Sequence, residues 1–258
     1  MHTYCLIRFQ RKGIKLFFPE RIKSIKKRDK VLEVGPGNTP FYRSDTLLEK
    51  IFDSEDEAFE QSGRTESRNL KKEIVYYKDD TFPFANKEFD YVICSHVLEH
   101  IPKNDLPFFV LELARVAKMG YVEIPLYNFE LITALDVHLS LIFVDTNNML
   151  HFIFKEDINL EEDAYVRLRK LYEKLGFSGQ VIPLNLNIFG SGFEFKEKVD
   201  FTIHDNVESF FNIVENETLF YKLKWHKGFS YFLKKIMYQF SKNIFKQKLY
   251  NKFRIVIK

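Results

Sequence analysis

The sequence predicts an α/β fold with a mostly parallel sheet, on three observations. Short runs of β-forming residues recur along residues 31–125, and a helical apolar pattern follows the fourth of them. Most of these runs are apolar throughout, as in parallel strands covered by helices on both faces. The first run, Val31–Val34, ends in Gly-Pro-Gly, a turn at which the backbone approaches a neighbouring group closely.

The expected elements follow one another in a simple order. Ile22 and Ile25 lie among basic residues and predict a short amphipathic helix before the first strand. Asn104 or Asp105 is expected to cap the helix that follows the fourth strand, and this helix is expected to end at Met119-Gly120. The predicted strands cover residues 31–35, 46–49, 73–77, 89–94 and 121–124.

Regularity is lost after the fifth strand. Residues 126–160 hold two apolar runs around Asp145-Thr146-Asn147-Asn148, which predicts a β-hairpin or lid inserted in the sheet. A helix is expected at 161–175, and closing strands at 180–204. A helical stripe then predicts a C-terminal helical extension.

Charge divides the chain into three parts. Residues 1–30 form a basic lead-in with net charge +8, residues 31–217 form the predicted domain with −16, and residues 218–258 carry +11. The acidic domain disfavours a nucleic acid partner. The basic, aromatic extension either packs on the domain or lies on an anionic membrane surface. Oligomeric state is not predicted.

Cysteine content and hydropathy bear on the compartment. The two cysteines, Cys5 and Cys94, give no disulfide framework. No segment reaches the roughly 18 uncharged apolar residues of a membrane span, and the stretch before Arg8 is too short for a signal peptide. We therefore expect a cytoplasmic protein.

Polar residues that end the parallel strands predict a ligand site, because such ends meet at one crevice. Gly35 and Gly37 follow the first strand, and Glu49 ends the second, where an acid can accept both hydroxyls of a ribose. Asp79 or Asp80 follows the third, and Ser95 to His100 follow the fourth. Pro40 replaces the third glycine of a pyrophosphate-binding turn, so the pattern favours adenosine without phosphates.

Three stretches carry a family resemblance. V-L-E-V-G-P-G at 31–37 and D-D-T-F-P-F-A-N-K-E-F-D-Y-V-I-C-S-H-V-L-E-H-I-P at 79–102 resemble the motifs of class I S-adenosylmethionine-dependent methyltransferases, and L-E-L-A-R-V-A-K-M-G-Y-V-E-I-P at 111–125 is similar to their following helix and fifth strand. The resemblance implies a Rossmann-like fold and S-adenosylmethionine as cofactor, with S-adenosylhomocysteine as product. It also implies roles for individual residues: Glu33, Gly35 and Gly37 at the methionine end, Glu49 (or Asp53) at the ribose, Asp79 or Asp80 at the adenine, and Ser95 in the crevice.

The stretch H-V-L-E-H at 96–100 supplies the candidate catalytic residues, His96 and His100. Alone it matches an inverted zinc-peptidase signature, which needs a helix that Pro102 disfavours. Some O-methyltransferases carry Glu-x-x-Glu-His here as metal ligands, and this likeness implies a site of His96, Glu99, His100 and His138. Such a set suits Mn²⁺, Fe²⁺ or Zn²⁺ better than Mg²⁺. Alternatively, His96 is a general base without metal, or Glu99 and His100 only cap the following helix.

These features predict an O-methyltransferase that acts on a hydroxyl of a small molecule. The expected acceptor is a sugar, either linked to a nucleotide or part of a surface-glycan precursor. It is reached by elimination, because C-S-H-V stands where amino-methylating enzymes carry Asn-Pro-Pro-Tyr. Two alternatives stay open: a non-catalytic adenosyl-binding protein, and a module recruited to membranes through residues 218–258.

Overall fold

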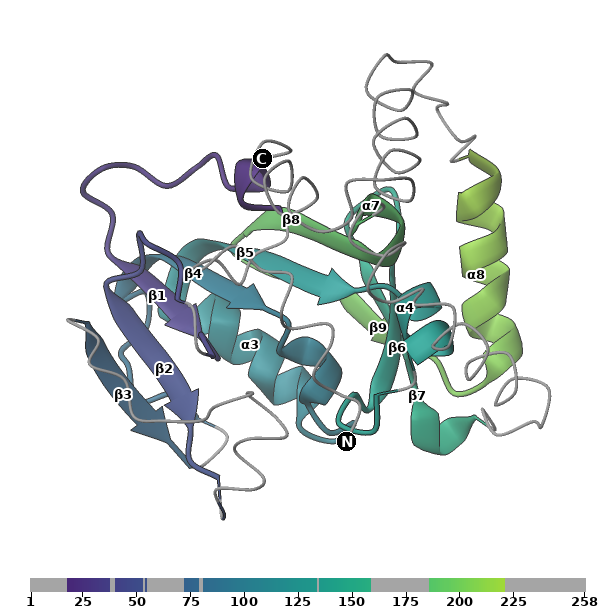
Figure 1. The fold of residues 1–258 in the computed structure, drawn as a ribbon. Coiled ribbons are helices and arrows are strands. Elements are labelled where there is room, and N and C mark those ends of the chain that lie inside the picture. The colour runs from purple at the N-terminus through teal and green to yellow at the C-terminus, as the bar shows by residue number, and fades with distance from the viewer. Residues whose placement is uncertain are drawn as a thin grey trace, which may run out of the picture. The chain divides into compact units, whose positions relative to one another are not determined.

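The computed structural model describes residues 18–37, 40–52, 54, 72–78, 81–133, 135–158 and 186–220 (Figure 1). The chain divides into two units after Glu215, and the elements below belong to the first unit except for the end of the last helix. The helix predicted at 161–175 and the extension from residue 221 onward lie outside the described residues.

The central sheet has six strands in the order β3-β2-β1-β4-β5-β8, so the α/β fold with a mostly parallel sheet is confirmed. All pairs are parallel except β5 with β8, which is antiparallel. The order reverses at β1, which lies between β2 and β4, and this is where ligands bind in such sheets. The strands are β1 Val31–Val34, β2 Thr46–Lys50, β3 Glu73–Tyr77, β4 Phe89–Ser95, β5 Ala117–Pro125 and β8 Gly190–Lys196.

The helix α3, Leu106–Val116, packs on the central sheet through a buried stripe that includes Phe109 and Leu113. It ends before Met119-Gly120, the end that the sequence predicts, because residues 117–120 already belong to β5. A Cβ on Gly120 would lie 2.5 Å from the carbonyl oxygen of Val92 and 2.7 Å from the Phe195 ring. This glycine therefore permits close strand packing and does not terminate the helix.

The prediction of an amphipathic helix before β1 is wrong. A single 3-10 turn, η1 Pro19–Arg21, is followed by non-helical chain. The carboxylate of Glu194 accepts hydrogen bonds from the backbone N–H groups of Lys23 and Ser24, which removes these donors from any helix. The isoleucines of this segment instead pack against Val31, Tyr91 and Tyr121 of the sheet.

The insertion after β5 forms a hairpin of β6, Ser140–Val144, and β7, Leu150–Phe154. The hairpin does not join the central sheet as predicted, because β7 pairs in parallel with β9, Phe201–Ile203, in a separate three-stranded sheet. Its turn is closed by Asp145, whose Oδ1 accepts the backbone N–H groups of Asn147 and Met149.

The closing strands predicted at 180–204 are thus divided between two sheets: β8 completes the central sheet and β9 the second one. The remaining described elements are η2 Leu98–His100, α4 Tyr127–Thr133, η3 Lys155–Asp157, α7 Leu186–Phe189 and α8 Val207–Phe220. None of the described helices has the length and apolar character needed to cross a bilayer.

Candidate functional site

The turn after β1 requires its glycines. Gly35 and Gly37 have φ angles of +57° and +52°, a region that side chains with a Cβ rarely adopt. A Cβ on Gly35 would lie 2.6 Å from a methyl group of Val97, which follows β4. The turn therefore packs directly on the segment that carries His96, Glu99 and His100.

Glu33 lies within β1, next to this turn, and is buried. Its Oε2 accepts hydrogen bonds of 2.7 Å from the backbone N–H of Phe41 and of 2.7 Å from the Ser44 hydroxyl. The carboxylate thus orders the short connection between β1 and β2. Its role at the methionine end of a cofactor stays a prediction.

The other predicted cofactor residues are only partly within the described chain. Glu49 is buried near the carboxyl end of β2, and Ser95 ends β4. The Ser95 hydroxyl donates to Glu123 Oε1 at 3.0 Å. Asp79, Asp80 and Asp53 lie outside the described residues, so the adenine position stays a prediction.

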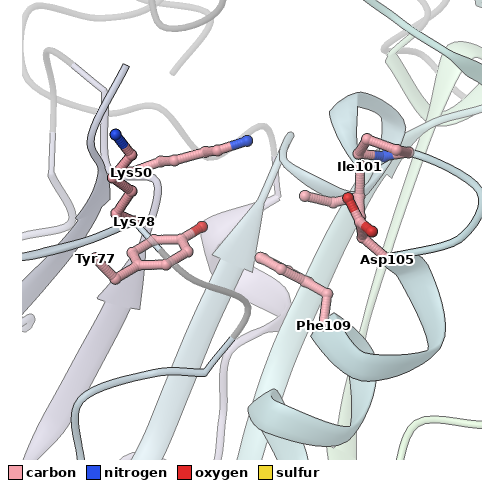
Figure 2. Close-up of a pocket in the computed structure, with 7 residues that line it drawn as sticks. Lys50, Tyr77, Lys78, Ile101, Asp105 and Phe109 are labelled. Carbon is pink, nitrogen blue, oxygen red and sulfur yellow. The ribbon is translucent and has the colours of Figure 1, made fainter. Parts of the chain in front are cut away.

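A pocket opens at the carboxyl ends of β2 and β3, opposite the start of α3 (Figure 2). Tyr77 and Phe109 point toward each other across it, and Lys50 and Lys78 stand on the strand side (Figure 2). No motif in the sequence singles out this pocket, although the positions of its residues at the ends of β2 and β3 were the available signal. The lining residues are Lys50, Tyr77, Lys78, Ile101, Pro102, Asp105 and Phe109.

His96 lies immediately after β4 with a φ of +54°, between two buried carboxylates. Its Nδ1 is 3.4 Å from Glu99 Oε1, and its Nε2 is 3.3 Å from Glu123 Oε1. Burial lowers the pKa of His96, but the carboxylates of Glu123 and Glu99 outweigh burial and raise the pKa to about 9. The ring is therefore an imidazolium at neutral pH, which weighs against the predicted role of general base.

Glu123, on β5, is a central residue that the sequence analysis missed. Besides Ser95 and His96, it contacts the Tyr121 hydroxyl, which donates to Oε2 at 2.7 Å, and the Phe18 backbone N–H, which donates to Oε2 at 3.0 Å. The available signal was an acid inside an otherwise apolar strand, because a buried carboxylate needs partners. Glu123 fixes His96 at the carboxyl edge of the sheet.

Glu99, His100 and His138 form the metal-site cluster. One potential ligand atom from each lies within 4.8 Å of the others. His96, the fourth predicted ligand, is not part of this group and instead forms ion pairs with Glu99 and Glu123. The structure thus brings together three of the four residues, one from the 126–160 insertion and two from η2.

The buried carboxylate of Glu99 carries a negative charge. Burial raises its pKa, but the adjacent His96 and the charges of His100 and His138 lower it to about 2. Neither oxygen accepts a well-aligned hydrogen bond from the described part of the chain. An ionised carboxylate with unfilled acceptor capacity, beside two imidazoles, is a donor set that fits a divalent transition metal.

The two imidazoles of the cluster are oriented through their Nδ1 atoms. His100 Nδ1 lies 2.9 Å from the carbonyl oxygen of Val137, and His138 Nδ1 hydrogen-bonds to Glu130. Each contact places the proton on Nδ1, so that Nε2 would be the atom that binds a metal. The rings meet edge to face, with centroids 4.6 Å apart.

Comparison with known proteins supports the family resemblance. Residues 49–122 match the family model described as a methyltransferase domain. The resemblance to class I S-adenosylmethionine-dependent methyltransferases is therefore confirmed over these residues, which are similar to a methyltransferase domain. The Gly-Pro-Gly turn precedes the matched segment. No curated protein gives a significant match.

Solved structures give more distant similarities. The PH0226 protein of Pyrococcus horikoshii is 22% identical with a TM-score of 0.34, and the alignment covers 50% of this chain and 64% of that one. A SAM-dependent methyltransferase from Methanosarcina mazei is 15% identical with a TM-score of 0.33, over 53% and 74%. One from Archaeoglobus fulgidus is 20% identical with a TM-score of 0.31, over 42% and 52%. The chain thus spans less than two thirds of two of these three.

Proposed function

We propose that this protein transfers the methyl group of S-adenosylmethionine to a hydroxyl of a small, sugar-like acceptor, with a divalent metal at Glu99, His100 and His138. One juxtaposition carries the proposal. The Gly35 turn, which favours a cofactor, packs on Val97, two residues before Glu99. The cofactor turn and the metal-site cluster therefore belong to one edge of the sheet.

The chemistry places different demands on the two parts of the site. The methyl group already has a good leaving group in the sulfonium, so the protein chiefly aligns the acceptor oxygen with it. A new C–O bond forms as the C–S bond breaks, S-adenosylhomocysteine leaves, and the hydroxyl proton is released to solvent. A divalent metal, when bound, would make that hydroxyl more acidic. His96, held as a cation by Glu99 and Glu123, would keep this edge ordered.

The acceptor class is inferred from the net charge of the domain and from the absence of an Asn-Pro-Pro-Tyr motif after the fourth strand. Residues 31–217 carry a net charge of −16, which opposes an approaching nucleic acid. A small acceptor carries far fewer negative charges than a nucleic acid and is repelled less. The basic residues 1–30 offer partners for the diphosphate of a nucleotide-linked sugar.

Calorimetric titrations of the wild type and two variants test the proposal. We expect S-adenosylhomocysteine to bind the purified full chain with one-to-one stoichiometry in calorimetry, and Gly35→Ala to weaken this binding. Phe108→Ala, at an exposed site on α3, is the control that leaves it unchanged. Absence of binding to the folded wild-type protein contradicts the proposal.

Methyl transfer is then measured with methyl-labelled cofactor and a panel of sugar nucleotides, with and without a chelator. Labelled methyl in an ether formed from a hydroxyl, with transfer abolished by the chelator, supports the full proposal. Transfer that resists the chelator supports the second candidate, metal-independent transfer. Cofactor binding without transfer to any acceptor identifies a non-catalytic adenosyl-binding protein.

A further inference from the structure

The insertion after β5 is connected by hydrogen bonds to the segment that carries Glu99 and His100. The backbone N–H of Leu139 donates to the Glu99 carbonyl oxygen at 2.7 Å. The Leu139 carbonyl oxygen in turn accepts the backbone N–H of Lys155 at 2.8 Å. Residues 135–139 are therefore fixed between η2 and η3, and His138 lies on this fixed segment.

Glu130, on α4, is the central side chain of this connection. It has no exposed surface. One carboxylate oxygen contacts His138 Nδ1, and the other accepts the Lys155 ammonium at 3.0 Å. Lys155 also donates to the Leu135 carbonyl oxygen at 2.7 Å, so the three side chains and the loop backbone form one network.

This network has the composition needed to orient a metal ligand. A carboxylate on Nδ1 fixes the tautomer and the ring plane of a histidine and makes Nε2 a better donor. A buried carboxylate costs free energy unless it is paired, and Lys155 supplies the opposite charge. The Glu130–Lys155 ion pair holds the imidazole of His138, and a ligand atom of this imidazole lies within 4.8 Å of ligand atoms of Glu99 and His100. This position favours a role in metal binding over a role in packing alone.

We propose that Glu130 and Lys155 are positioning residues that hold His138 in its metal-binding orientation. The insertion is on this account not a lid: it is the part of the chain that completes the metal-site cluster. The inference rests on the metal site of the proposed function. It adds two residues, Glu130 and Lys155, to the metal-site cluster as its supports.

The test is calorimetric titration of the full chain with Co²⁺, with the visible absorption of bound Co²⁺ as a second readout. Glu130→Gln is expected to weaken Co²⁺ binding about 10- to 100-fold and to change the absorption, because the ligand orientation is altered. Lys155→Met is expected to act in the same direction, and Lys155→Arg to keep near wild-type affinity. S-adenosylhomocysteine affinity is expected to stay unchanged in all three.

Lys103→Met is the matched control, because it removes an ion pair to Asp157 of η3 without touching Glu130. Co²⁺ affinity within twofold of wild type in both Glu130→Gln and Lys155→Met overturns the inference and leaves the metal site standing. If the wild-type protein binds S-adenosylhomocysteine but no Co²⁺, the metal part of the proposed function fails and the inference with it. Should Glu130→Gln not fold, the two Lys155 variants decide.

Discussion

The two sheets hold their histidines in opposite ways. At the carboxyl edge of the central sheet, His96 lies between Glu99 and Glu123, whose charges keep it protonated. In the second sheet, His151 Nδ1 is 3.1 Å from His204 Nε2, a hydrogen bond that requires one of these two nitrogens to lack a proton. Burial lowers the pKa of His204, and the charge of His151 lowers it further, against the opposing effect of Asp205.

We interpret this difference as a difference in role: the edge of the central sheet forms the ligand site, and the second sheet supports the fold. Carboxylates converge where the parallel strands end, and the neighbouring carboxylates set the charge state of the histidine there. The second pair has one more distant carboxylate, because His151 Nε2 is 3.7 Å from Asp145 Oδ2. The rings of Phe143 and Phe210 lie beside the pair, and His204 Nδ1 hydrogen-bonds to the Ser209 hydroxyl at 3.1 Å. We therefore expect perturbation of the central edge to affect ligands, and perturbation of the second sheet to affect stability.

The largest expected effect on stability comes from the second sheet. Phe152 on β7 is fully buried, and Phe152→Ala should lower the free energy of unfolding by about 3–5 kcal/mol, because it leaves a cavity. Denaturant unfolding measures this loss. At a temperature where the variant is folded, its affinity for S-adenosylhomocysteine should equal that of wild type. Weaker S-adenosylhomocysteine binding with an unchanged free energy of unfolding would contradict the roles given to the two sheets.

A smaller loss of stability, with a loss of ligand binding, is expected from Gly35→Ala. The left-handed φ costs about 1–3 kcal/mol for a residue with a Cβ, and the methyl group also meets Val97. Unfolding and cofactor titrations on the same sample measure both effects. The double variant Gly35→Ala/Val97→Ala should recover the steric part of the stability loss. Unchanged cofactor affinity in Gly35→Ala would remove this turn from the site.

Alkaline pH should destabilise the central edge. The folded-state pKa of His96 is about 9, above the ordinary value of 6.5, so its stabilising effect is complete below pH 6.5 and is lost as pH rises through 9. Thermal unfolding between pH 6.5 and 9.5 should show a falling Tm, and His96→Gln should flatten that fall. An equally steep fall in His96→Gln would contradict the assignment of His96 as a buried cation.

Acid pH should produce the smallest of these effects, in the second sheet. The folded-state pKa of His204 is lowered, so its contribution to stability is present above pH 6.5 and is lost as pH falls through and below that value. His204→Gln should reduce the loss of Tm between pH 7 and 5. His96→Gln should not reduce it, and if it does, the two histidines are not distinct in the way described.

Local patterns predicted the central sheet well. All five strands before the insertion were expected, because each is an apolar run bounded by a turn signal, and β3 matches its predicted range. The same local signals predict Gly35, Glu49 and Ser95 at the carboxyl ends of their strands, but they do not single out Lys50, Tyr77 and Lys78, which lie at the ends of β2 and β3. Gly120 shows the limit: in sequence it resembles a helix stop, and only the neighbouring Val92 and Phe195 explain it.

Long-range pairing could not be predicted. The hairpin was expected from its two apolar runs, but nothing local shows that β7 pairs with β9, some 50 residues further along. For the same reason Glu123 and Glu130 were missed as site residues. Each is a single acid in an apolar context, and their roles depend on His96 and His138, which lie far away in the sequence.

The central claim is that one edge of the sheet holds both a sulfonium cofactor and a metal. A crystal structure with S-adenosylhomocysteine and Mn²⁺, recorded with anomalous scattering, tests it directly. We predict the homocysteine end of the cofactor against Gly35 and Gly37, its ribose at Glu49, and one anomalous peak bounded by Glu99, His100 and His138. A cofactor bound away from this turn, or a fully occupied Mn²⁺ site that excludes these three residues, would contradict the account.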